Sequence, residues 1–178
     1  RSALLFPDMN KKLLAVIDMQ NDFIDGALGT EEAQKIVPSV RARILSAREA
    51  GEEVVYTRDT HGADYLSTEE GKNLPVPHCI KGSAGWQISE EIPVFGEIVD
   101  KPTFGSTALA QKVKDGGYER VELIGLCTDI CVISNALLIK AFCPEIRICV
   151  RESCCAGVTE KSHRTALDAM RACQVLIV

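Results

Sequence analysis

The chain has 178 residues, 46% of them hydrophobic and 25% charged, with a formal net charge of −5 at pH 7, which predicts one domain with a full core. Charges of both signs are scattered without a basic stripe or interleaved aromatic residues, so we expect no nucleic-acid partner. No apolar run approaches the roughly 20 residues of a membrane-spanning helix, so we expect no membrane partner.

Residues 1–8 precede Met9, which would make an ordinary first residue, and we interpret them as the remnant of an appended segment. A single domain is therefore expected over residues 9–178. Its first element is the short apolar run at 13–17, which ends at Asp18 and is typical of a buried parallel strand.

Apolar residues at helical spacing predict a helix over residues 31–50, and Gly51 ends it. A second strand is expected at 53–57. Residues 60–96 lack clean periodicity and hold many of the glycines and prolines, together with Trp86. A loop of this length in a compact domain is usually functional or disordered.

The second half of the chain continues the alternation of strands and helices. Strands are expected at 97–100, 120–124, 145–150 and 174–178, and helices at 106–114, 131–141 and 159–173. Thr159 and Ser162 are candidate N-caps of the last helix. The alternation predicts an α/β domain with a largely parallel sheet, in which ligands bind beyond the carboxyl ends of the strands.

Cys131 opens the expected helix at 131–141. Unpaired backbone N–H groups and the positive end of the helix dipole favour its thiolate, which is the nucleophilic form, and the same amides could hold an oxyanion. Asp18 and Lys101 also follow predicted strands, so we expect them at the same edge of the sheet. Asp18 could accept the thiol proton and Lys101 could stabilise the thiolate. The alternative is a buried Asp18–Lys101 ion pair beside an inert core cysteine.

A second group combines a strand end with the long loop. Asp59 and His61 follow the strand at 53–57, and His78 lies further along with two glutamates before it. An aspartate, two histidines and another acid can bind a divalent metal. The alternative is a pair of exposed loop histidines.

Eight cysteines lie mostly in apolar runs, such as those around Cys143, Cys149 and Cys173, where free cysteine packs as a small hydrophobic residue. We therefore expect a reducing, cytoplasmic setting. His163, the one histidine after Cys131, lies in a polar helix and is expected at the surface, which disfavours a Cys–His pair.

Three separated segments agree in order and spacing with a known pattern: Ala15-Val16-Ile17-Asp18-Met19-Gln20-Asn21-Asp22-Phe23, Lys101-Pro102-Thr103-Phe104-Gly105-Ser106 and Gly125-Leu126-Cys127-Thr128-Asp129-Ile130-Cys131-Val132. They resemble the isochorismatase-like cysteine hydrolases, and the resemblance covers nearly the whole chain from Lys11 onward. It implies a three-layer αβα, Rossmann-like fold with a six-stranded, mainly parallel sheet. It also implies a catalytic triad of Asp18, Lys101 and Cys131.

The resemblance further implies a cis peptide bond between Leu126 and Cys127, and an oxyanion hole formed by the backbone amides of Cys127 and Cys131. Within the family, the long loop resembles the nicotinamidase branch through Thr57-Arg58-Asp59-Thr60-His61 and through Pro77-His78-Cys79-Ile80-Lys81-Gly82-Ser83-Ala84-Gly85. That branch binds a divalent metal, here Zn, Fe or Mn, which holds the pyridine nitrogen of nicotinamide directly or orders the ring through water.

The implied ligands are Asp59, His61, Glu70 and His78. Many nicotinamidases have a third histidine where this chain has none, so Glu70 is chosen there, with Glu69 as the alternative. Phe23 is a plausible contact to the substrate ring, and Trp86 is a second candidate. No organic cofactor is expected, because amide hydrolysis transfers no electrons.

The resemblance thus implies an amidohydrolase with a cysteine nucleophile and a thioester acyl-enzyme. Its small-molecule substrate would be nicotinamide, hydrolysed to nicotinate and ammonia. The alternatives are an N-carbamoyl amide hydrolase or another hydrolase of the family, and, outside that class, a non-catalytic binding protein or a redox sensor using Cys127 and Cys131. Family members commonly form dimers or tetramers, so a homo-oligomer is expected.

Overall fold

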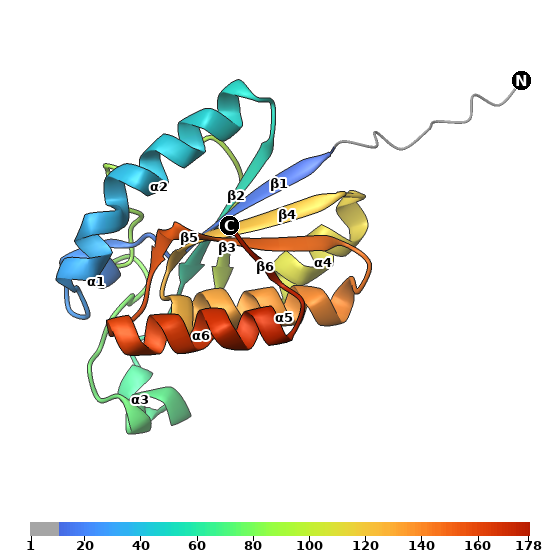
Figure 1. Cartoon of the computed structure of the whole chain (residues 1–178). Coiled ribbons are helices and arrows are strands. Elements are labelled where there is room, and N and C mark those ends of the chain that lie inside the picture. Colours follow the sequence, from blue (N-terminus) through green and yellow to red (C-terminus); the bar gives the residue numbers. More distant parts are fainter. Residues whose placement is uncertain (1–10) are drawn as a thin grey trace, which may run out of the picture.

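The computed structural model describes residues 11–178, so our interpretation of residues 1–8 lies outside the described part of the chain. Six strands form one sheet in the order β3-β2-β1-β4-β5-β6, and every neighbouring pair is parallel (Figure 1). The strands are β1 (Lys12–Ile17), β2 (Glu53–Asp59), β3 (Ile98–Lys101), β4 (Arg120–Leu126), β5 (Arg147–Ala156) and β6 (Leu176–Ile177).

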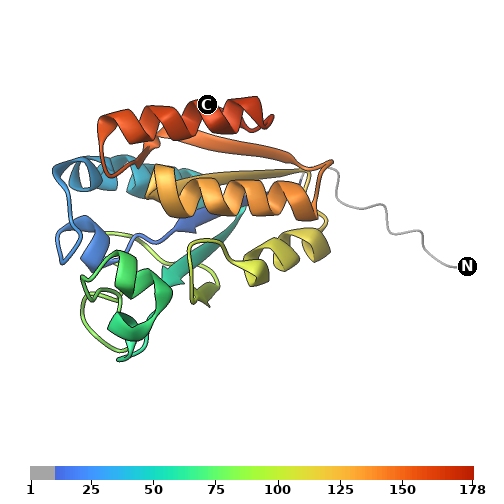
Figure 2. The ribbon, with the colours of Figure 1, turned by 90° about the horizontal axis from the view of Figure 1, so that it is seen from below.

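Helices cover both faces of the sheet, because the central strands carry apolar side chains on both sides. Leu14 and Val16 of β1 pack against α2 (Glu31–Glu49), and α1 (Asn21–Ile24) lies beside that helix. The opposite face is covered by three helices, α4 (Thr107–Gly116), α5 (Ile133–Phe142) and α6 (Glu160–Ala172). Figure 2 shows these three helices side by side, which confirms the predicted three-layer αβα fold.

Local capping explains where the longer helices begin. The side chain of Thr30 accepts a hydrogen bond from the Ala33 N–H at the start of α2, and Ser106 accepts one from Leu109 at the start of α4. At α6, Thr159 is the N-cap and forms a reciprocal capping box with Ser162.

The structure differs from the predicted elements in four places. The helix expected at 131–141 begins as a π-helical turn over Thr128–Val132, and only α5 is α-helical. β5 runs six residues past the expected end at 150, whereas β6 has only two residues. The long irregular segment contains a 3₁₀ turn at Tyr65–Ser67 and a short helix, α3 (Glu69–Asn73). The short helix α1 was also not predicted.

Gly125 lies where the two central strands leave no room for a side chain. It is the register partner of Ile17, and its φ of 116° lies in the region that favours glycine. A Cβ atom at this position would collide with the Ile17 carbonyl oxygen. Asp18 follows Ile17 directly, so this contact fixes the end of β4 against the residue that begins the site.

In residues 11–178, no helix is long and apolar enough to cross a lipid bilayer.

Candidate active site

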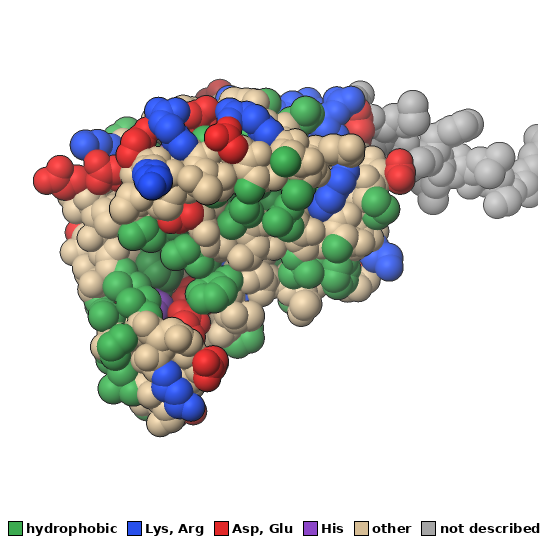
Figure 3. Space-filling model, turned by 60° about the horizontal axis from the view of Figure 1, so that its bottom comes forward, with side chains coloured by type: hydrophobic (Ala, Val, Ile, Leu, Met, Phe, Trp, Pro, Cys, Tyr) green, Lys and Arg blue, Asp and Glu red, His purple; other side chains and the backbone are tan. Residues whose placement is uncertain are grey.

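The expected site residues converge at the carboxyl ends of four neighbouring strands. Asp18 follows β1, Asp59 ends β2, Lys101 ends β3, and Cys131 lies in the π-helical turn after β4. The strand order reverses at β1, and ligands of open parallel sheets bind at such a reversal. Figure 3 shows a hollow with a largely hydrophobic rim, in which histidine and acidic atoms are visible.

Asp18, Lys101 and Cys131 form one buried cluster. The Lys101 ammonium nitrogen lies 2.8 Å from Asp18 Oδ2 and 3.5 Å from the Cys131 sulfur. It also donates a hydrogen bond to the Thr103 carbonyl oxygen at 3.0 Å. All three side chains of the cluster are at most 4% exposed. The ammonium therefore contacts both the carboxylate and the thiol.

The two oxygens of the Asp18 carboxylate have different surroundings. Oδ1 accepts a hydrogen bond of 2.7 Å from the Thr57 hydroxyl. Oδ2 forms the ion pair with Lys101 but has no hydrogen-bond donor at good geometry among the described residues. Oδ2 is consequently the oxygen with capacity to accept a proton.

The electrostatics of this cluster favour a neutral thiol in the resting protein. Burial, together with the charge of Asp18, raises the pKa of the Cys131 thiol well above its ordinary value of 9.0, and Lys101 offsets this only in part. Burial lowers the pKa of Lys101, but the Asp18 and Asp59 charges outweigh it and raise that pKa above 10.5.

The turn that carries Cys131 begins with a cis peptide bond between Leu126 and Cys127, as the resemblance implied. The N–H groups of Ile130 and Val132 both donate to the Cys127 carbonyl oxygen, at 3.1 and 3.0 Å. These bonds close a compact turn around the nucleophile candidate.

Asn135 joins this turn to the segment after Lys101. Its fully buried side chain donates to the carbonyl oxygens of Cys131 at 2.8 Å and Phe104 at 3.1 Å, and it accepts from the Ser106 N–H at 2.9 Å. Sequence reasoning missed this residue. Its signal was an amide side chain in a mostly apolar helix, one turn after the cysteine.

His163 is buried rather than exposed, so the expectation of a surface histidine is wrong. Its Nδ1 atom shares a hydrogen bond of 2.7 Å with the Thr128 hydroxyl in the turn that carries Cys131. Cys173 likewise differs from expectation, because it is exposed at the end of α6 rather than packed in an apolar run. All eight cysteines are free.

Four side chains beside this cluster could hold a metal ion. One donor atom each from Asp59, His61, Glu70 and His78 lies within 4.8 Å of all the others. The His61 Nε2 atom is 2.8 Å from Asp59 Oδ2 and 3.6 Å from Glu70 Oε1, and the His78 Nε2 atom is 3.5 and 3.7 Å from the same oxygens. Ligands of a tetrahedral zinc ion lie about 3.4 Å apart, so this donor set fits such an ion.

Neighbouring groups orient these ligands. His78 donates from Nδ1 to the Val76 carbonyl oxygen at 2.8 Å, which leaves the Nε2 lone pair available to a metal. Tyr65 packs edge-on against His61 and His78, with ring centroids 4.8 and 5.0 Å away. Burial tends to raise the pKa of Asp59, but its hydrogen bond with His61, the neighbouring His78 and the Lys101 charge outweigh burial. That pKa therefore lies well below 3.8, and the carboxylate stays ionised.

Glu70 and Glu69, the two candidates for the acidic metal ligand, differ in their position relative to the other three side chains. Glu70 belongs to the four-residue group, whereas Glu69 lies outside it and accepts a hydrogen bond of 3.3 Å from the Asn73 side chain. Both glutamates are in the first turn of α3, a helix capped by Thr68.

The two candidate ring contacts have different surroundings. Phe23 is half-buried and packs edge-on against His78, with centroids 5.5 Å apart. Trp86 is stacked under Arg58 at 3.6 Å, and its indole N–H donates to the Thr60 hydroxyl at 2.9 Å. These contacts make Trp86 an anchor of the long segment against β2.

Gln20 is a second residue that the sequence reasoning missed. Its buried side chain donates to the carbonyl oxygens of Asp59 and Trp86 at 2.9 and 2.8 Å, and it accepts from the Asp59 N–H at 2.8 Å. It therefore ties the end of β2 and the long segment to β1. Its place two residues after Asp18 was the only signal in the sequence.

Known proteins match this chain over nearly its whole length. The family described as Isochorismatase domain matches residues 12–178. Nicotinamidase 3 of Arabidopsis thaliana is 30% identical over 171 residues, which cover 90% of this chain and 81% of that protein.

Two solved structures show the same fold. Pyrazinamidase of Pyrococcus horikoshii in complex with zinc has a TM-score of 0.83 and 28% identity, covering 94% of this chain and 98% of that one. The nicotinamidase/pyrazinamidase of Bacillus subtilis also has a TM-score of 0.83, with 27% identity, covering 94% of this chain and 99% of that one. The chain belongs to the isochorismatase family of hydrolases.

Proposed function

We propose that this protein hydrolyses nicotinamide to nicotinate and ammonia through a cysteine nucleophile. The single observation that carries the proposal is the contact of Lys101 with both Asp18 and Cys131, next to a group of four metal-ligating side chains. The similarity to Nicotinamidase 3 of Arabidopsis thaliana and to the zinc-bound pyrazinamidase supports it.

In the proposed reaction, Asp18 Oδ2 accepts the Cys131 proton as the sulfur attacks the amide carbon. The oxyanion accepts hydrogen bonds from the backbone N–H groups of Cys127 and Cys131. Asp18 then returns the proton to the leaving nitrogen, which departs as ammonia and leaves a thioester. A water molecule, deprotonated by Asp18, attacks the thioester and releases the carboxylate product. Asp18 then gives its proton to the leaving sulfur, which regenerates the Cys131 thiol.

Lys101 keeps the free-energy difference small between the state with the proton on Cys131 and the state with the proton on Asp18. A thiolate and a carboxylate side by side repel each other, and the fixed ammonium offsets that repulsion at both partners. Asp18 and Cys131 share one proton. The two titration steps of this pair therefore belong to the coupled cluster and cannot be assigned to one residue alone.

Asp59, His61, Glu70 and His78 would hold a divalent ion beside the cluster. When bound, such an ion supplies a Lewis acid that attracts the lone pair of the substrate ring nitrogen. Phe23, packed on His78, is proposed as the contact to the ring face. The zinc in the Pyrococcus pyrazinamidase makes zinc the first metal to test.

The experiment measures ammonia release from nicotinamide and from an N-carbamoyl amide, on protein whose metal content is determined in the same preparation. We expect turnover of nicotinamide, and no turnover by Cys131→Ala. Preference for the N-carbamoyl substrate would instead assign the protein to that branch of the family. Activity retained by Cys131→Ala would remove the nucleophile from the proposal.

A further inference from the structure

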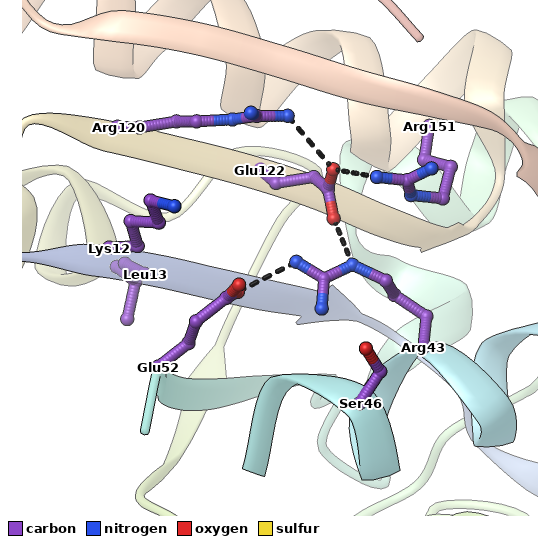
Figure 4. Close-up of a pocket in the computed structure, with 8 residues that line it drawn as sticks. All are labelled: Lys12, Leu13, Arg43, Ser46, Glu52, Arg120, Glu122 and Arg151. Atoms are coloured by element: carbon purple, nitrogen blue, oxygen red, sulfur yellow. Dashed lines mark hydrogen bonds and ion pairs between the residues drawn. The ribbon is translucent and has the colours of Figure 1, made fainter. Parts of the chain in front are cut away.

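A second cavity lies at the opposite edge of the sheet from the candidate active site. It encloses about 320 Å³ where β1 and β4 begin, and its polar lining includes Lys12, Arg43, Arg120, Glu122 and Arg151 (Figure 4). β1 runs from Lys12 to Ile17, a length of about 20 Å at the usual rise of a strand. A ligand in this cavity would therefore not touch the catalytic cluster.

The lining carries an excess of positive charge. Glu122 is 2% exposed and forms ion pairs with Arg43, with Arg120 at 3.2 Å and with Arg151 at 2.7 Å. Among the described residues, the one other carboxylate in the lining is that of Glu52, which lies 2.6 Å from Arg43. Among the described residues of the lining, four cations face two carboxylates, which gives these six side chains a net charge of +2.

Several donors around the cavity are not used by these carboxylates. A guanidinium group has five N–H donors, whereas Arg120 and Arg151 each reach a carboxylate through one nitrogen. The Nε atom of Arg151 is buried and has no hydrogen-bond partner among the described residues. Lys12 forms no ion pair with the other described residues of the lining (Figure 4). A buried donor without a partner is rare in folded proteins, so this one points to a missing acceptor.

We propose that this cavity binds a phosphate group, either free phosphate or the phosphate of a small monoester. A phosphate group carries between one and two negative charges near neutral pH, which suits the positive charge of the described lining residues. Its oxygens accept from several donors at once, and arginine forks suit that geometry. The proposal does not depend on the hydrolase assignment, since none of its residues belongs to the catalytic cluster.

A purely structural role would also explain the ion pairs of Glu122, since buried carboxylates need partners. It does not explain why Lys12 adds a further cation at the rim, or why Arg151 keeps an unpaired buried nitrogen. The two interpretations differ in a measurable way, because only a binding site gives saturable affinity for phosphate.

Isothermal titration calorimetry on the full-length protein tests the proposal. Inorganic phosphate and ribose 5-phosphate are titrated at constant ionic strength, with ribose as the uncharged control. We expect one saturable site for at least one phosphate compound and none for ribose. The compound that binds more tightly distinguishes free phosphate from a monoester.

Variants locate the site. Lys12→Gln removes a cation without an ion pair among the described residues, so the fold should persist, and we expect affinity to fall by roughly tenfold or more. Arg120→Gln should weaken binding similarly. Lys35→Gln, which removes an exposed cation from α2, is the matched control and should leave affinity unchanged. Absence of saturable binding, or equal affinity in Lys12→Gln and the unaltered protein, would overturn the proposal.

Discussion

Lys101 and Asp18 form a fully buried ion pair of 2.8 Å. Removing one partner of such a pair leaves an uncompensated charge in the core. We therefore expect Lys101→Met to lower the free energy of unfolding by about 3–5 kcal/mol and to abolish most ammonia release. Urea unfolding and steady-state kinetics measure the two effects separately.

Lys101→Arg is the matched variant for charge. It restores a cation, but a planar guanidinium is larger and cannot take the place of a compact ammonium between a carboxylate and a sulfur. We expect it to recover part of the stability and little of the activity. Full activity in Lys101→Met would show that the ammonium has no part in the reaction.

Asp18→Asn removes the proposed proton acceptor while keeping the shape of the side chain. We expect kcat to fall roughly 100- to 10,000-fold, the range found for a missing general base. Thr57→Ser keeps the hydroxyl that binds Oδ1 and is the control, with activity close to that of the unaltered protein. Comparable kcat values for Asp18→Asn and Thr57→Ser would exclude Asp18 as the base.

Glu70→Gln and Glu69→Gln test the acidic metal ligand. Only Glu70 belongs to the group of four donors, so we expect its variant to lose zinc affinity by roughly 10- to 100-fold. Glu69→Gln, which changes an adjacent side chain outside the group, should bind zinc normally. The zinc content of each variant after dialysis against a weak chelator tests this without an activity assay. Equal losses of zinc in both variants would contradict the assignment of Glu70 as the ligand.

Asn135→Ala tests whether the hydrogen bonds from α5 to Phe104 and Ser106, which follow Lys101, support activity. The change leaves the Ser106 N–H and two carbonyl oxygens without their partner, so we expect a loss of about 1–3 kcal/mol in unfolding free energy. We also expect kcat to fall more than KM changes, because the turn that carries Cys131 loses its hydrogen bond from Asn135. Ser134→Ala is the neighbouring control. A variant that is destabilised but has normal kcat would restrict Asn135 to a structural role.

Glu122 predicts how stability depends on pH. Burial tends to raise its pKa, but hydrogen bonds and charges from Arg151 and Arg43 outweigh burial and lower it below 4.5. A lowered folded-state pKa contributes stability above pH 4.5 that is lost as the pH falls further. We expect Glu122→Gln to be less stable at pH 7 and to lose less on acidification. Urea midpoints between pH 3 and 7 measure this. Parallel curves for the two proteins would contradict it.

Strand ends were the most predictable feature of this molecule. Asp18 is found where the apolar run of β1 stops, because a central parallel strand buried on both faces has a continuous apolar sequence. Lys101 ends the edge strand β3, which is largely exposed and was predicted from its place in the alternation of strands and helices. The last residues of β5 could not be predicted in this way. Arg151 and Glu152 interrupt the apolar run there, and the strand continues because Cys155 and Ala156 pair with β4, which is a contact between distant segments.

Short elements and polar networks were harder to predict. The helices α1 and α3 have four and five residues, too few for a helical period to show. His163 was wrongly predicted at the surface, although the spacing of apolar residues in α6 indicates burial. It shares one stripe of α6 with Ala166, Leu167 and Met170, all buried, so its position on the helix indicates burial despite the polar neighbours.

Gly125 and Ile17 are paired in the centre of the sheet, and the proposed base and nucleophile lie on the chain just beyond them. Because these strands are hydrogen-bonded to each other, we expect the separation of Asp18 and Cys131 to change very little with thermal motion. His78 instead belongs to the long segment between β2 and β3. If the proposed function holds, mutations in that segment should change which substrate is accepted while leaving the arrangement of Asp18, Lys101 and Cys131 undisturbed.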